Sequence, residues 1–202
     1  SKMSNTSACG LYSSYFGFSG EQRITAIEYD ANGNYYITGR TQINGGIPVT
    51  PGAFQQSSRG SYDGFIAKFT ENNMLVWCTY YGGSESDSPE TMALKGKYLY
   101  IAGSTTSNNF PVSTGAYQAM NGGGIDGFII KMDTSGQREW ATYIGGSLND
   151  YIEAVCITNI GDIVLAGYSY STDYPITSGS LQPLFGGGAI DCIYSRLSAY
   201  GM

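Results

Sequence analysis

Three aspartates occupy the same place in a phrase that the chain repeats. Asp63, Asp126 and Asp191 begin the runs DGFIAKF, DGFIIKM and DCIYSRL, each directly after a glycine-rich or polar loop. An aspartate at such a position typically accepts backbone N–H bonds from its own loop and fixes the entry into a strand. The alternative partner is a calcium ion, because hard cations bind carboxylate oxygens. The three aspartates are therefore candidate calcium ligands as well as loop anchors.

Two further loops could add oxygen ligands to such an ion. They are SESD (Ser84–Asp87) and SLND (Ser147–Asp150), although both are also typical of plain turns. A calcium site needs six or more oxygens, and the chain has no D-x-D-x-D pattern. Apart from calcium, the sequence indicates no cofactor.

Aromatic residues in loops are the candidates for contact with a ligand, because loops on a rigid scaffold often carry function. They stand beside repeated prolines, so local packing is the alternative. The candidates are Phe110, Tyr117, Tyr168, Tyr170 and Tyr174. Trp77 and Trp140 occupy equivalent places in two copies of the repeat, and we expect them to stack between neighbouring sheets.

The composition argues against catalysis. The chain has no histidine, which removes the commonest general base and the commonest ligand of transition metals. Asp173 or Glu153 with a neighbouring carboxylate could act as acid and base, but no spacing selects such a pair. The sequence therefore predicts a protein that is not an enzyme, with a polysaccharide-active hydrolase or lyase as the remaining catalytic alternative.

Charge and apolar content exclude other classes. The formal net charge is −6 and the ten cationic residues are scattered, so we do not expect nucleic acid as a partner. No apolar run approaches the ~18 residues of a membrane helix, and there is no signal peptide, so we expect no membrane insertion and interpret the chain as mature or as part of a longer one. The four cysteines show no C-x-x-C spacing and are expected to be lone thiols, although an even number permits disulfides.

The elements that must position these residues follow from an internal repeat. Gly39, Gly103 and Gly167 end similar runs and lie 64 residues apart both times. A fixed period of this length is typical of stacked structural repeats. We therefore expect one repeat domain over residues 1–202, with copies at about 20–83, 84–146 and 147–198.

Each copy holds four runs with strand character. In the first copy they are ITAIEYD, YYITG, DGFIAKF and VWCTYYGG, separated by turn-forming stretches such as DANGN and TENNM. A small antiparallel sheet cannot bury both of its faces alone, and stacking such sheets around an axis buries them. The expected fold is all-β and propeller-like, with three four-stranded blades of about 64 residues. A solenoid or a sandwich is the alternative.

The motifs resemble a known repeat. TYYGGSESD (Thr79–Asp87) and YLYIAGSTTSNNFPVSTGAYQ (Tyr98–Gln118), with DGFIIK after them, are similar to the bacterial SBBP β-propeller repeat over about residues 11–198. The first copy departs most from it. The resemblance implies an exported or cell-surface bacterial protein, often large, whose propeller serves as a binding or display module. It implies no ligand contacts.

The two ends of the chain leave the last copy incomplete. Residues 11–19 contain an outer strand, Leu11–Phe16, whereas the last copy ends with its third strand at Ile190–Leu197. The N-terminal strand is expected to close the last blade, as in many propellers. Because propellers typically have four to eight blades, three arrangements stay open. They are a homodimer that completes a six-bladed ring, a portion of a longer propeller, and an open arc capped by a partner.

Taken together, the residues and the resemblance predict a non-catalytic binding or display module that recognises a protein or a glycan. The alternative is a structural spacer or assembly component of a cell-envelope complex.

Overall fold

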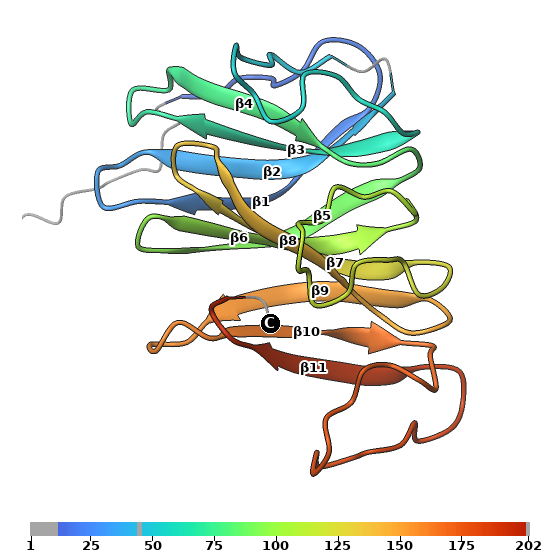
Figure 1. Ribbon diagram of the computed structural model, residues 1–202. Coiled ribbons are helices and arrows are strands. Elements are labelled where there is room, and N and C mark those ends of the chain that lie inside the picture. Colours follow the sequence, from blue (N-terminus) through green and yellow to red (C-terminus); the bar gives the residue numbers. More distant parts are fainter. Residues whose placement is uncertain (1–11, 44–45, 201–202) are drawn as a thin grey trace, which may run out of the picture.

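A computed structural model describes residues 12–43 and 46–200. Within these residues the chain forms eleven strands and no helix, arranged as three antiparallel sheets (Figure 1). The first sheet contains β1 (Gln22–Tyr29), β2 (Tyr35–Gln42), β3 (Tyr62–Phe69) and β4 (Leu75–Tyr81). The second contains β5 (Asp87–Lys95), β6 (Tyr98–Thr105), β7 (Asp126–Asp133) and β8 (Arg138–Ile144). The third contains β9 (Asp150–Ile157), β10 (Ile163–Ser169) and β11 (Asp191–Leu197).

Each sheet follows the order of its strands in the sequence, so every neighbouring pair is antiparallel and consecutive. The prediction of an all-β chain built from small antiparallel sheets is confirmed. The third sheet has three strands among the described residues, not the four expected for each blade. β5 begins at Asp87, which pairs with Thr105.

The repeated glycine of the second strand has a steric cause. A β-bulge in the first strand of each sheet brings the backbone of that strand close to Gly39, Gly103 and Gly167. A Cβ at any of the three would collide with a backbone carbonyl, namely that of Arg23, Ser88 or Tyr151. The same close approach between two strand backbones therefore recurs every 64 residues, and only glycine permits it.

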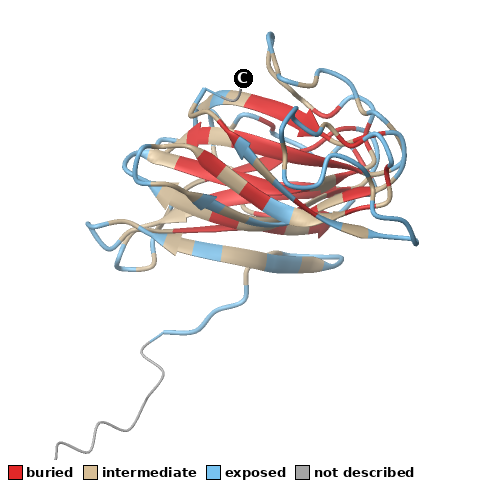
Figure 2. Ribbon diagram, turned by 90° about the horizontal axis from the view of Figure 1, so that it is seen from below, coloured by how far each residue is buried: buried red, intermediate tan, exposed pale blue. Residues whose placement is uncertain are grey.

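The sheets stack face to face, and the core lies between them. One apolar cluster joins the first and second sheets through residues such as Tyr36, Ile66 and Phe128, and a second joins the second and third sheets through Ile129 and Leu165. Figure 2 shows buried residues gathered on strands in the interior of the stack. Trp77 packs on the first of these clusters and Trp140 on the second, which confirms that they lie between neighbouring sheets.

The stack is open, because the first and third sheets each have one face with no neighbouring sheet among the described residues. On the first sheet, this face is covered in part by residues of its own repeat. Ile47 and Val49 pack there against Phe65, and β1 is exposed along much of its length (Figure 2).

The prediction that an N-terminal strand closes the last blade is wrong for the described residues. Residues 12–17 form no strand, and Leu11 lies outside the described residues. The ring of Phe16 instead packs on the open face of the first sheet, 5.4 Å from the ring of Phe65 and 5.8 Å from that of Phe69. Burial of this apolar ring on the nearest open sheet explains the difference, because the third sheet lies at the other end of the stack.

The thiols behave as expected where the structure describes them. Cys78 is buried, Cys156 and Cys192 are exposed, and these three are free. Cys9 lies outside the described residues. In the described part of the chain, no helix is long and apolar enough to cross a membrane.

Candidate functional site

Asp63 anchors the loop that precedes β3. It is fully buried, and its Oδ2 accepts hydrogen bonds from the Gln55 side chain (2.8 Å) and from the backbone N–H of Arg59 (2.8 Å). Its Oδ1 accepts from the N–H of Gly60 (2.9 Å). Burial raises the pKa of Asp63 even though these donors favour the charged form. The structure thus shows the loop-anchoring role that the sequence predicts.

Asp126 repeats this arrangement before β7 with one difference. Its Oδ2 accepts from the Gln118 side chain (2.7 Å) and from the N–H of Gly122 (2.8 Å). Its Oδ1 is buried with no hydrogen-bond partner among the described residues, because the N–H of Gly123 donates to Asn121 instead. Burial is the main cause that raises the pKa of Asp126 to about 6.

Asp191 is the least enclosed of the three aspartates. Its Oδ2 accepts from the N–H of Gly186 and from the Gln182 side chain (3.3 Å). The glutamine partners Gln55, Gln118 and Gln182 were not identified from the sequence. The sequence does contain a pattern that could have identified them, since each glutamine stands eight or nine residues before its aspartate.

The glutamines also connect each sheet to the next. The Oε1 of Gln55 accepts from the N–H of Gly82 (3.1 Å), at the end of the first sheet. The next N–H, that of Gly83, donates to Asp87 (2.7 Å), at the start of the second sheet. The buried Asp87 also accepts from the hydroxyls of Thr105 and Ser107. Hydrogen bonds to Gln55 and to the successive backbone N–H groups of Gly82 and Gly83 therefore link Asp63 to Asp87.

The junction between the second and third sheets repeats these hydrogen bonds. Gln118 accepts from the N–H of Gly145 (2.9 Å), and the N–H of Gly146 donates to the buried Asp150 (2.6 Å). Asp150 accepts in addition from the hydroxyls of Ser169 and Ser171. The motifs GAFQ, GGS and the aspartate of SESD and SLND thus form one repeated structural network.

The same geometry bears on calcium. Among the described residues, no group of three or more acidic, cysteine or histidine side chains is placed to hold a metal ion. Both oxygens of Asp63 already face N–H donors, whereas a cation would require their lone pairs. Among the predicted ligands, Asp126 has a buried oxygen, Oδ1, that accepts no hydrogen bond from the described residues.

Two of the aromatic residues predicted to contact a ligand are buried, which corrects that prediction for them. Phe110 is 3% exposed and lies between the rings of Phe128 (4.5 Å) and Tyr81 (5.3 Å). Tyr174 is 6% exposed, and its hydroxyl pairs with Ser195 (3.0 Å). Both residues precede the repeated proline, and both fill the core rather than a loop surface.

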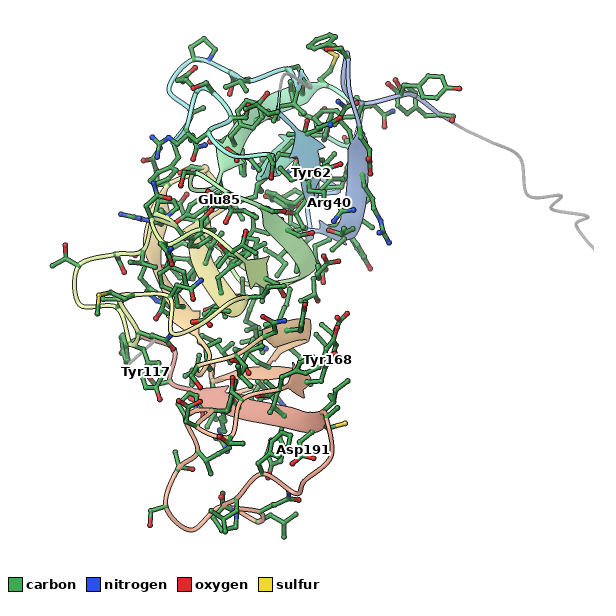
Figure 3. All side chains as sticks on the ribbon, turned by 90° about the vertical axis from the view of Figure 1, so that its right-hand side faces the viewer. Arg40, Tyr62, Glu85, Tyr117, Tyr168 and Asp191 are labelled. Atoms are coloured by element: carbon green, nitrogen blue, oxygen red, sulfur yellow. The ribbon has the colours of Figure 1, made fainter. Side chains whose placement is uncertain are left out.

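Tyr168 and Tyr170 form a cluster with a residue that the sequence analysis missed. The ring of Tyr168 stacks on that of Tyr151 at 4.7 Å, and Tyr170 meets both rings edge-on at 6.2 and 6.4 Å. All three side chains are half-buried. Tyr151 could not be foreseen, because its pairing with Tyr168 depends on the bulge in β9. Tyr117 is 46% exposed and lies on the other side of the molecule from Tyr168 (Figure 3).

The tyrosine pair is one member of a row that crosses the three sheets. The same cross-strand position holds Arg23 and Arg40 in the first sheet, Ser88 and Ser104 in the second, and Tyr151 and Tyr168 in the third. We call these six residues the variable row. Arg40 and Tyr168 lie toward the same side of the molecule (Figure 3). Each of the six side chains is exposed or half-buried.

The charge of the variable row changes from one end to the other. The guanidinium of Arg40 lies over the ring of Tyr62 (5.1 Å) and 3.9 Å from Glu21. At the other end, burial and then Glu153 raise the pKa of Tyr168, with Glu90 among the further causes. Glu90 in turn accepts from the hydroxyl of Ser88 (2.6 Å). From the first sheet to the third, the row thus offers guanidinium groups, hydroxyls and tyrosine rings, and the carboxylates of Glu90 and Glu153 act on it from outside the row.

Asp173, one of the carboxylates considered for catalysis, is engaged locally. It accepts from the backbone N–H of Ser147 (2.8 Å) and from its hydroxyl (2.9 Å), and these bonds lower its pKa. Comparison with models of known protein families gives no match, and none of the curated proteins searched matches the chain.

Proposed function

We propose that this chain is a non-catalytic binding or display module of an exported or cell-surface bacterial protein, and that its three sheets are blades of a propeller. The stacked antiparallel sheets and their period of 64 residues support the propeller. The bacterial and extracellular setting is supported by the resemblance to the SBBP repeat.

One observation carries the binding role, namely the contrast between the variable row and the rest of the repeat. The buried network of glutamine, glycine and aspartate is nearly the same at both junctions between sheets. The variable row changes from arginine to serine to tyrosine at one structural position. Packing alone would favour similar residues at similar positions, so this divergence on an accessible surface favours recognition.

The chemistry of the row suits a glycan or a segment of protein that crosses the sheets. Rings of Tyr168 and Tyr170 offer apolar faces, and Glu90, Glu153 and Arg40 offer hydrogen bonds of both polarities. The row stays accessible beside a neighbouring sheet, since Ser88 and Ser104 are only half-buried although the second sheet has a sheet on each face.

Binding can be tested with a glycan array and with a pull-down from an extracellular protein fraction, followed by affinity measurement on any ligand found. We expect Tyr168→Ala and Arg40→Ala each to weaken binding about tenfold or more, since aromatic and arginine contacts dominate binding surfaces. Tyr29→Ala is the matched control, because Tyr29 is exposed on β1 away from the row. Ligands that bind all variants equally would refute the site, and two empty screens would argue against the binding role.

A structural spacer is the second candidate, and the repeated network between sheets favours it, because such a network holds neighbouring sheets in a fixed relation. A spacer predicts that no ligand is retained and that substitutions in the variable row have no effect beyond stability. The same variants therefore distinguish the two candidates.

A further inference from the structure

A glutamate occupies the β-bulge in the first strand of both the second and the third sheet. The extra residue, which has no partner in the neighbouring strand, is Glu90 in β5 and Glu153 in β9. A bulge of this kind changes the direction in which a side chain points. Glu90 is half-buried, Glu153 is exposed, and among the described residues neither forms an ion pair.

Both carboxylates act on the same tyrosine. Burial is the first cause that raises the pKa of Tyr168, and the charges of Glu153 and Glu90 add to it. Glu153 belongs to the sheet of Tyr168, whereas Glu90 belongs to the second sheet. Tyr168 is therefore close to carboxylates from two successive sheets.

The rings of Tyr151, Tyr168 and Tyr170, which we call the Tyr168 cluster, form an open corner. Tyr151 stacks on Tyr168 with 21° between the ring planes. The plane of Tyr170 is inclined to that of Tyr168 by 64°, and the two centroids lie 6.2 Å apart. A cation within about 6 Å of a ring centroid is attracted by the face of that ring. A cation in this corner is thus within reach of both Tyr168 and Tyr170.

Elsewhere the chain places its own cations over half-buried tyrosine rings. Arg40 lies over Tyr62 at 5.1 Å, and Lys131 lies over Tyr98 at 4.3 Å. In the part of the chain that the structure describes, no lysine or arginine lies over a ring of the Tyr168 cluster. The cluster therefore differs from the other tyrosines in having no cation supplied by the chain.

The composition of the third repeat agrees with this difference. The first two repeats have four cationic residues each, whereas the third has one, Arg196, and five acidic residues. Arg196 pairs with Asp162. Aromatic faces and two carboxylates thus lie together in the repeat that has the fewest cations to offer them.

The position of the cluster stays accessible when another sheet lies on the same face. Ser104 is the equivalent of Tyr168 in the second sheet, and Thr106 is the equivalent of Tyr170. Both are half-buried although the third sheet packs on the second. Arg40 is the equivalent of Tyr168 in the first sheet and is half-buried beside the second sheet. Access therefore comes from the place of these residues at the ends of the strands.

We propose that the Tyr168 cluster, together with Glu90 and Glu153, binds the cationic side chain of an arginine or lysine in an extended segment of a partner protein. The rings supply aromatic faces, and the carboxylates supply the opposite charge. Arg23 and Arg40 stand at the other end of the variable row, so the row carries opposite charges at its two ends. A protein segment with basic and acidic side chains matches both ends, whereas a neutral glycan matches neither charge. This inference rests on the proposed binding function and names the ligand class.

Affinity measurements with a matched pair of peptides test the proposal. Stacked sheets lie roughly 10 Å apart, so about six extended residues span the row from the first sheet to the third. The probe is a Gly/Ser peptide with an arginine and an aspartate about six residues apart, and its partner carries citrulline, an uncharged analogue of nearly the same shape, in place of arginine. We expect the arginine peptide to bind about tenfold more tightly than the citrulline peptide, because only the guanidinium is charged.

Variants assign this difference to the cluster. Tyr168→Leu and Glu153→Gln should each remove most of it, and Tyr168→Phe should keep more of it than Tyr168→Leu, because phenylalanine retains an aromatic face. Glu153 is exposed, so Glu153→Gln keeps the test valid if Tyr168→Leu is unstable. Glu71→Gln is the matched control, since Glu71 is exposed in the turn after β3, at the opposite end of the strands from the row.

Three results would overturn the proposal. They are equal affinity for the two peptides, no binding of the arginine peptide at millimolar concentration, and a preference for arginine that survives Glu153→Gln. A neutral glycan whose binding is lost in Tyr168→Ala, with no binding of the arginine peptide, would overturn this inference and leave the proposed binding function standing.

Discussion

Asp63 and Asp87 belong to neighbouring sheets, yet their carboxyl groups lie against the same residue, Gly82. A Cβ added to Gly82 would lie 2.7 Å from Oδ2 of Asp87 and 2.9 Å from Cγ of Asp63. Both aspartates are fully buried, and Asp63 is among the causes that raise the pKa of Asp87. The junction between the sheets thus holds two carboxyl groups whose separation depends on a glycine.

Gly82→Ala is expected to destabilise the fold by about 2–4 kcal/mol, because the methyl group has no space between the two carboxyl groups. Denaturant unfolding measures the loss. Gly52→Asn is the control, since a Cβ at Gly52 meets nothing within 4 Å and asparagine tolerates its φ of 81°. Equal stability of Gly82→Ala and the unmodified chain would contradict this account of the junction.

Gln55→Met is expected to cost about 2–4 kcal/mol, since it leaves the buried Asp63 and Gly82 without their shared partner. Methionine keeps nearly the volume of glutamine, so lost hydrogen bonds are the main change. Gln182→Met is the matched control at the equivalent but exposed position and is expected to cost less than about 1 kcal/mol. Chemical denaturation of the two variants gives the comparison, and similar losses for both would refute the role of burial.

Stability is expected to fall as the pH rises from about 4 to 7. Burial raises the pKa of Asp87 to about 6, from an ordinary value of 3.8, and that of Asp126 to about 6. Between these values the folded state binds more protons than the unfolded state, so the contribution is fully present below 3.8 and is lost as the pH rises through 6. For each group the loss is on the order of 1–3 kcal/mol.

Thermal unfolding at a series of pH values measures this slope. Asp87→Asn should flatten the part of the slope near pH 6, because the amide does not titrate, and Glu71→Gln at an exposed position should leave it unchanged. A midpoint that instead rises steadily from pH 4 to pH 7 would show that burial does not govern these carboxyl groups.

Calcium at millimolar concentration is expected to leave the thermal midpoint unchanged. The oxygens of Asp63 are engaged by N–H donors, and the free Oδ1 of Asp126 supplies only one ligand of the six or more that calcium takes. Unfolding with calcium and with a chelator checks this expectation. A calcium-dependent rise that disappears in Asp126→Asn would instead identify Asp126 as a ligand.

Much of the fold could be predicted because the repeat fixes local requirements. Gly39 and its equivalents recur wherever the first strand approaches the second, so a steric rule at one residue appears as a period in the sequence. The role of Asp63 was also predictable, because an aspartate before a strand has few local partners other than its own loop. Gln55 was missed, since its two partners come from different strands and no local pattern relates them.

The aromatic residues show where such prediction ends. Phe110 and Tyr170 both follow the second strand of a sheet, yet the first is buried between two sheets and the second is partly accessible. Their difference depends on which face of a sheet each side chain occupies and on whether another sheet lies there.

By itself, the sequence determined three small antiparallel sheets, their order along the chain and the anchoring aspartates. These depend on contacts within one repeat or between consecutive repeats. Only the tertiary structure decided that Phe16 packs on Phe65 and that Tyr151 joins Tyr168. Those relationships arise from the faces and edges that remain open after the sheets have stacked, and the openness of a surface is a property of the assembled stack rather than of any single segment.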